Sequence, residues 1–126
     1  MANLPAPIKD IQFIADEVLD LTGHYQNLGV HEELDAETFV TVLDEASKFL
    51  HEYVGPLNNP ADEQGCRIDG NKVTTPDGFK ELYKNYCESG WSSLDGDPEL
   101  GGQGLSSWLQ LILGELNTYY CPGWSN

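Results

Sequence analysis

The stretch Gly90-Trp91-Ser92-Ser93-Leu94-Asp95-Gly96-Asp97-Pro98-Glu99-Leu100-Gly101-Gly102-Gln103-Gly104-Leu105 is punctuated by glycine and separates two amphipathic segments. Apolar residues recur every three or four positions over 79–87 before it and over 109–116 after it. Such spacing is typical of helices that bury one face against a core. The stretch is therefore predicted to be a loop that joins two packed helices.

Other helices are predicted before this pair. The predicted elements are a helix over Ile8–Leu21, a helix from the N-cap Asp35 to Tyr53, a short hairpin over Arg67–Val73, a helix from the N-cap Thr75 to about Gly90, and a helix after Leu105 with Ser106 or Ser107 as its N-cap. Gly23 is predicted to end the first helix and Gly55-Pro56 the second. The polar segments 24–34 and 58–65 are predicted as loops. The fold class is therefore all-α, a bundle of about four helices with one short β-hairpin.

Charge limits the classes of partner. The chain has 126 residues, with 6 Lys and Arg against 21 Asp and Glu, which gives a formal net charge of −15. Nucleic acids and anionic membrane surfaces bind clustered cations, whereas the cations here are scattered singly. The composition therefore predicts neither a nucleic-acid nor a membrane partner. No run of eighteen apolar residues is present to span a bilayer.

Cysteine and histidine spacing gives no sign of a disulfide framework or a metal site. Cys66, Cys87 and Cys121 are odd in number, form no Cys-x-x-Cys pair, and no apolar signal segment follows Met1. This pattern is typical of a reduced, cytoplasmic protein. The three histidines lack the spacing of a zinc site, so no metal site is predicted.

Two ligand-binding interpretations of the glycine-rich loop are weaker than a packing role. The run Asp95–Glu99 has alternate carboxylates, but Pro98 and the serine at the twelfth position do not fit an EF-hand. The run Gly101–Gly104 could present backbone N–H groups to a phosphate, but no lysine follows and the neighbours are acidic. We favour an interpretation in which these glycines permit a tight turn with close backbone packing.

The last predicted helix is apolar on more than one face. Six large apolar residues fall within positions 108–116, so we expect this helix to need cover on all sides. We predict an association surface at Trp108, Leu111 and Leu113. The cover is either structure that this chain does not contain or a second copy of the chain.

The sequence contains no recognisable catalytic arrangement. Glu115 has no second carboxylate, histidine or lysine nearby in the sequence, so its default role is a helix residue facing solvent or a partner. Cys121, beside Pro122, fits a small buried apolar residue as well as a nucleophile. No catalytic, cofactor-binding or metal-binding residue is therefore predicted in this chain.

Motifs of the glycine-rich stretch carry a family resemblance. Gly90-Trp91, the Pro98-Glu99 pair and the run Gly101–Leu105 that opens the next helix resemble the N-terminal helical domain of FAD-dependent acyl-CoA dehydrogenases. Segments that resemble the larger bacterial members, including the methylthiopropionyl-CoA type, are Ala6–Phe13 with Glu17-Val18-Leu19, Gly55–Asn58, Gly65–Arg67 and Val73–Lys80. The resemblance covers essentially the whole chain but only the front part of such an enzyme.

The resemblance implies that this chain contributes no catalytic residue or cofactor site to the reaction of the family. In the family, FAD is held mostly by a middle β-domain and a C-terminal helical domain, and a glutamate of the C-terminal domain removes the α-proton of acyl-CoA. The resemblance therefore implies a chain that is inactive alone and walls the acyl channel. In the family that channel begins just after the equivalent of the last helix, which maps it onto Trp124, Ser125 and Asn126. The chain departs from its relatives by ending before their Ser-His-Gly-like continuation.

Two functions are compatible with this reasoning. We expect a single helical domain over 1–126, with 1–34 as an N-terminal extension that holds the first helix and 35–126 as the core helices, lacking the β-domain and the C-terminal helical domain. The first function is the N-terminal domain of an acyl-CoA dehydrogenase. The alternative is a free-standing helical interaction protein that dimerises, or docks on a separately encoded remainder of the enzyme, through its last helix.

Overall fold

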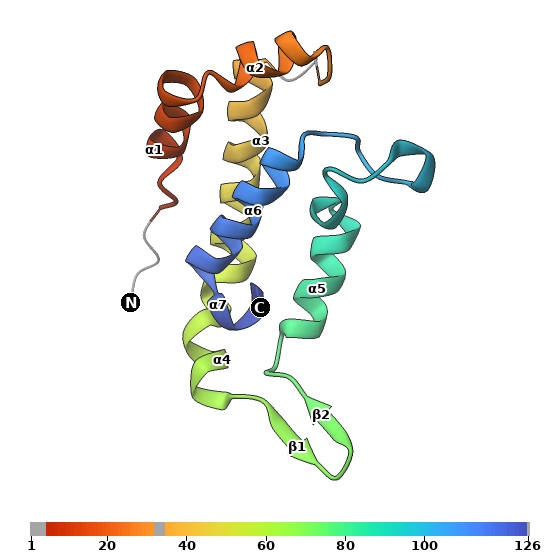
Figure 1. Ribbon diagram of the computed structural model, residues 1–126. Coiled ribbons are helices and arrows are strands. Elements are labelled where there is room, and N and C mark those ends of the chain that lie inside the picture. The colour runs from red at the N-terminus through yellow and green to blue at the C-terminus, as the bar shows by residue number, and fades with distance from the viewer. Residues whose placement is uncertain (1–4, 32–34, 126) are drawn as a thin grey trace.

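The computed structural model describes residues 5–31 and 35–125 and is predominantly helical (Figure 1). Helices α3 (Ala36–Phe49), α5 (Phe79–Glu88) and α6 (Ser107–Tyr120) run along the length of the molecule. Helix α6 packs against α3, α5 lies to one side of them, the N-terminal helices lie at one end, and a hairpin projects from the other end (Figure 1). The predicted all-α fold with one short hairpin is confirmed.

The N-terminal helical segment differs from its prediction. Helix α1 (Ile8–Phe13) continues into a π turn over Ile14–Val18, and the backbone breaks at Asp20 before α2 (Leu21–Leu28). The prediction that Gly23 ends a helix is wrong, because Gly23 lies inside α2 and its N–H donates to Asp20 Oδ1 at 3.3 Å. The Asp20 carboxylate occupies the space that a Cβ atom at position 23 would need.

The second helical segment does not stop at Gly55-Pro56. Helix α3 passes through a π turn over Leu50–Val54 and a 3₁₀ turn over Gly55–Leu57 into α4 (Asn58–Gln64). Proline is tolerated in the first turn of a helical segment, where its missing N–H is not needed. The predictions of a stop at Gly55-Pro56 and of a loop at 58–65 are therefore wrong, since α4 occupies most of that segment.

Two predicted N-caps are confirmed by their hydrogen bonds. Asp35 Oδ1 accepts from the Thr38 N–H at 2.7 Å at the start of α3. Ser106 Oγ accepts from the Trp108 N–H at 3.1 Å at the start of α6. The Ser106 hydroxyl is also hydrogen bonded to the Tyr25 hydroxyl, which ties α2 to the first turn of α6.

The predicted hairpin is confirmed, and the helix after it starts late. Strands β1 (Arg67–Asp69) and β2 (Lys72–Thr74) pair antiparallel and are exposed along their whole length. Helix α5 begins at Phe79 rather than after Thr75. The N-cap is Gly78, which has φ 87° and no side chain, so no side-chain hydrogen bond caps this helix.

The core lies where α6 meets α3 and the turn that follows α3. The largest side chains that are almost completely buried are Leu43, Leu50, Val54, Leu109, Leu113 and Leu116. On α3 the residues Phe39, Leu43 and Ala46 are buried. Tyr53, in the π turn after α3, is 43% exposed, and its ring centroid lies 4.9 Å from that of Phe49. Among the described residues, no helix is both long and apolar enough to cross a membrane.

Candidate functional site

The glycine-rich loop is closed by its own hydrogen bonds. The five consecutive backbone N–H groups from Gly101 to Leu105 donate to carbonyl oxygens of residues 93–98 at 2.8 to 3.1 Å. Gln103 Nε2 donates to the Gly90 carbonyl at 2.8 Å and so joins the two ends of the loop. A Cβ atom on Gly102 would overlap the backbone of Gly96. These contacts support the packing role over the phosphate-binding role.

The same loop tests whether this part of the chain fits the phosphates of FAD or acyl-CoA. A phosphate at Gly101–Leu105 would have to displace hydrogen bonds that close the loop, in a chain with a net charge of −15. The loop therefore does not fit such a group. Within 5–31 and 35–125, no group of three or more His, Cys, Asp or Glu side chains is arranged to hold a metal ion.

The residues predicted to line a channel lie at one end of the bundle. After α6 the chain turns at Cys121 into α7 (Pro122–Ser125). The centroid of the Trp124 ring lies 5.1 Å from the centroid of the Tyr86 ring of α5, in an edge-to-face arrangement. The Ser125 hydroxyl lies 3.0 Å from the Thr118 hydroxyl of α6. The structure thus brings Trp124 and Ser125 together and fixes them against α5 and α6. Asn126 lies outside the described residues.

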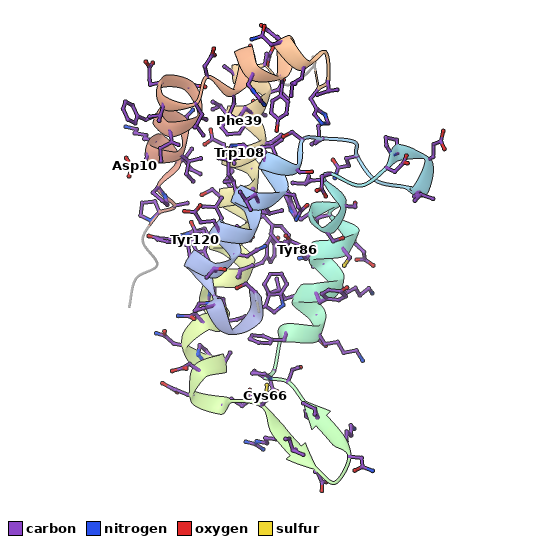
Figure 2. All side chains as sticks on the ribbon, viewed as in Figure 1. Asp10, Phe39, Cys66, Tyr86, Trp108 and Tyr120 are labelled. Atoms are coloured by element: carbon purple, nitrogen blue, oxygen red, sulfur yellow. The ribbon has the colours of Figure 1, made fainter. Side chains whose placement is uncertain are left out.

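A buried polar pair beneath Trp124 was missed by the sequence reasoning. Asn117 Nδ2 donates to the Tyr86 hydroxyl at 2.9 Å, and both residues are 7% exposed. Figure 2 shows Tyr86 on the side of α5 that faces α6. Burial raises the pKa of Tyr86, so its hydroxyl stays neutral at physiological pH. The sequence signal was an asparagine at core spacing from Leu113 and Leu116.

Cys121 is a buried apolar residue rather than a nucleophile. Its side chain is 1% exposed, and burial raises the pKa of the thiol. A thiol with a raised pKa is a poor nucleophile at neutral pH because the thiolate is scarce. Cys121 lines a cavity of about 210 Å³ with Phe79 and Pro122, and the exposed Cys66 lies at the same cavity. The functional alternative left open for Cys121 is therefore not supported.

The predicted association surface is only partly exposed. Leu111 is 65% exposed, Trp108 is partly buried, and Leu113 is 2% exposed within the core. Leu113 is therefore wrong as a surface residue, because it lies on the same helix face as Leu109 and Leu116. The opposite face of the helix, which includes Leu111, is open in the described chain, so the prediction that this face needs cover from outside the chain stays a prediction.

That open face borders a groove of about 820 Å³, which Pro7 also lines. We call it the α6 outer face, and its members are Gln110, Leu111, Gly114, Glu115, Thr118 and Tyr119. Glu115 is exposed at this groove, which agrees with the default role expected for it.

Comparison with known proteins gives the family likeness. No protein-family model matches the chain. A 3-methylmercaptopropionyl-CoA dehydrogenase of Ruegeria pomeroyi is 33% identical over 100 residues, which cover 79% of this chain and 17% of that protein. A butyryl-CoA dehydrogenase of Syntrophomonas wolfei subsp. wolfei is 29% identical over 114 residues, covering 84% of this chain and 18% of that protein. This chain is acyl-CoA dehydrogenase-like.

The resemblance expected from the sequence motifs is thereby confirmed. The acyl-CoA dehydrogenase-like chain spans less than a fifth of the length of the curated relatives it matches. In this chain the stretch 90–105, which carries the family motifs, forms a loop closed by its own hydrogen bonds and leads directly into α6. The structure thus gives the glycines of that stretch a packing role in this acyl-CoA dehydrogenase-like chain.

Proposed function

We propose that this acyl-CoA dehydrogenase-like chain is the N-terminal helical part of an FAD-dependent enzyme that oxidises acyl-CoA. In this role it walls the acyl channel with Trp124, Ser125 and Asn126. The observation that carries the proposal is the 33% identity, over 79% of the chain, to a relative named 3-methylmercaptopropionyl-CoA dehydrogenase. Residues 1–34 are an extension and 35–126 the core helices of this part.

The geometry of the C-terminal end supports a channel wall. An acyl chain needs an apolar surface that keeps its shape, and Trp124 packs on Tyr86 while Ser125 is hydrogen bonded to Thr118. The raised pKa values of Tyr86 and Cys121 keep both groups neutral there. A charged group beside the channel would oppose an apolar chain.

The chemistry of oxidation belongs to other parts of such an enzyme. FAD accepts the hydride when bound in the family, and the glycine-rich loop of this chain does not fit its phosphates. The described residues instead position an apolar wall and exclude water from it. The chain alone is therefore expected to be colourless and to show no acyl-CoA-dependent reduction of an electron acceptor. A flavin absorption spectrum of the purified chain would contradict this expectation.

A chimera tests the proposal. We would exchange the matched segment of the Ruegeria pomeroyi relative for this chain and measure flavin content and acyl-CoA-dependent reduction of an electron acceptor. The chimera is expected to retain flavin and activity, and Trp124→Ala is expected to raise KM for acyl-CoA. Tyr83→Ala, which removes a side chain that is 64% exposed on α5, is the matched control. A folded chimera that lacks activity, or equal KM values for the two variants, would contradict the proposal.

The α6 outer face favours a second candidate, a free-standing helical interaction protein. Leu111 is 65% exposed above a groove of about 820 Å³. In that case the purified chain would dimerise through this face, and Leu111→Glu would return it to a monomer. Sedimentation at tens of micromolar chain distinguishes this candidate from the first.

A further inference from the structure

The hairpin has an apolar face that is left largely uncovered. Ile68 lies opposite Val73 in the register of β1 and β2, so the two side chains share one face of the hairpin. They are 77% and 62% exposed. A two-stranded hairpin is only marginally stable in water unless its apolar face packs against something. A partner that covers this pair would therefore stabilise the hairpin.

The same end of the molecule carries most of the positive charge of the chain. Four of the six Lys and Arg residues lie within residues 67–84, which contain three Asp and Glu, although the net charge of the chain is −15. Arg67 and Lys72 are exposed on the hairpin, and Lys80 is exposed in the first turn of α5. None of these three forms an ion pair with another described residue. We call this surface the hairpin patch, and its members are Arg67, Ile68, Lys72, Val73 and Lys80.

The opposite end of the molecule is apolar and acidic. Helix α1 and the π turn after it lie at the end away from the hairpin (Figure 1). Phe13, Ile14 and Val18 are 60%, 46% and 61% exposed there. Asp16 and Glu17 in the same π turn are also exposed. We call these five residues the N-terminal patch. It is opposite in charge to the hairpin patch, and both patches expose apolar side chains.

We propose that the hairpin patch of one chain binds the N-terminal patch of a second copy. The two patches lie at opposite ends of the molecule, so a single chain cannot bring them together (Figure 1). Their opposite charges favour this pairing over a contact between two like patches. The apolar side chains of both patches are buried in the contact, and the charged ones surround them. Because the contact joins two different surfaces, the copies associate head to tail. The inference does not depend on the proposed function.

Charge reversal at each end tests this pairing. Sedimentation of the purified chain at tens of micromolar is expected to show species larger than a monomer. Arg67→Glu with Lys80→Glu reverses the hairpin patch, and Asp16→Lys with Glu17→Lys reverses the N-terminal patch. Either pair of substitutions is expected to weaken association by about tenfold or more. A chain with all four substitutions is expected to regain association, because its ends are complementary again and its net charge of −15 is unchanged.

Reversal of the N-terminal patch alone separates local pairing from a general repulsion between copies. Asp16→Lys with Glu17→Lys makes the net charge of the chain less negative, so a general repulsion would fall and association would strengthen. Head-to-tail pairing predicts weaker association instead. Circular dichroism of each variant checks that the helices are kept. Stronger association of this variant, or a chain with all four substitutions that stays dissociated, would overturn the inference.

The apolar part of the contact has its own variant and control. Ile68→Thr keeps a β-branched side chain on the hairpin and is expected to weaken association several-fold, because less apolar area is buried. Leu111→Gln, at a residue that is 65% exposed on the α6 outer face, is expected to leave association unchanged. A chain that is monomeric at tens of micromolar overturns the inference. An association that Leu111→Gln abolishes and Ile68→Thr leaves intact assigns the contact to the α6 outer face and also overturns the inference.

Discussion

The glycine-rich loop and the α6 outer face both contain a central glycine, yet the two glycines have opposite surroundings. Gly102 is enclosed by the backbone of Gly96, whereas a Cβ atom on Gly114 would meet no described atom outside its own helix. The loop satisfies its backbone N–H groups internally, while the outer face keeps a buried acceptor on Gln110 without a described donor. A glycine in a sequence therefore does not by itself say whether other atoms of the chain fill the space that its missing side chain leaves.

The largest expected effect is at the enclosed glycine. Gly102→Val is expected to destabilise the fold by about 4 kcal/mol or more, because its Cβ atom would overlap backbone that cannot move aside without breaking the loop hydrogen bonds. Asp95→Ala, in the same loop but exposed, is expected to change stability by about 0.5 kcal/mol or less. Urea unfolding of both variants checks this difference, and equal midpoints would contradict an enclosed Gly102.

The next largest change in stability is expected from truncating a leucine on the buried face of α6 rather than on its outer face. Leu109→Ala is expected to cost about 3 kcal/mol, because Leu109 is 1% exposed and its truncation leaves a cavity in the core. Leu111→Ala removes the same atoms from the outer face and is expected to change the stability of the isolated chain by about 0.5 kcal/mol or less. Thermal unfolding of the isolated chain measures both. A similar loss for the two variants would show that the outer face is covered in solution.

Local signals were sufficient for some elements and not for others. The caps Asp35 and Ser106 and the hairpin were predicted correctly, because each depends on residues within a few positions. The predictions that Gly23 and Gly55-Pro56 end helices are wrong, because both lie in helical segments. At Gly23 the deciding feature is the Asp20 carboxylate, which lies against the glycine. At Pro56 it is the change from an α-helix to a π turn before the proline. The spacing of apolar residues in the sequence encodes neither feature.

The candidate site shows the same limit. The assignment of Trp124 to a channel came from the family resemblance and that of Leu111 to a surface from helical spacing, and both roles stay predictions. The Tyr86–Asn117 pair joins residues 31 positions apart on two helices, and no local pattern predicts which of several polar residues will meet. Leu113 was misassigned because a helix with many apolar residues does not by itself reveal which of its faces meets the core.

A smaller change in stability is expected at Ser106, the N-cap of α6 that follows the glycine-rich loop. Ser106 is completely buried, accepts from the Trp108 N–H and is hydrogen bonded to the Tyr25 hydroxyl. Ser106→Ala is expected to cost about 1 to 2 kcal/mol, since an N-cap is lost and the partly buried Tyr25 hydroxyl loses its partner. Ser106→Thr keeps the hydroxyl and is the control for its loss. Chemical unfolding in which Ser106→Ala matches the unsubstituted chain would show that Tyr25 and water supply the cap.

The exposed cap of α3 gives the smallest effect, one that depends on pH. The pKa of Asp35 is lowered mainly by the hydrogen bond that its carboxylate accepts from the Thr38 backbone N–H. A carboxyl group whose pKa is lower in the folded state stabilises the fold above its unfolded pKa, and this stabilisation is lost as the pH falls through the folded value. Stability is therefore expected to decline as the pH falls from about 4 towards 2. Asp35→Asn keeps a capping oxygen that does not titrate, so its urea midpoint is expected to fall less over this range, whereas Asp95→Asn, which caps no helix, should follow the unsubstituted chain. Identical pH profiles for Asp35→Asn and the unsubstituted chain would mean that the ionised carboxylate gives α3 no advantage over a neutral cap.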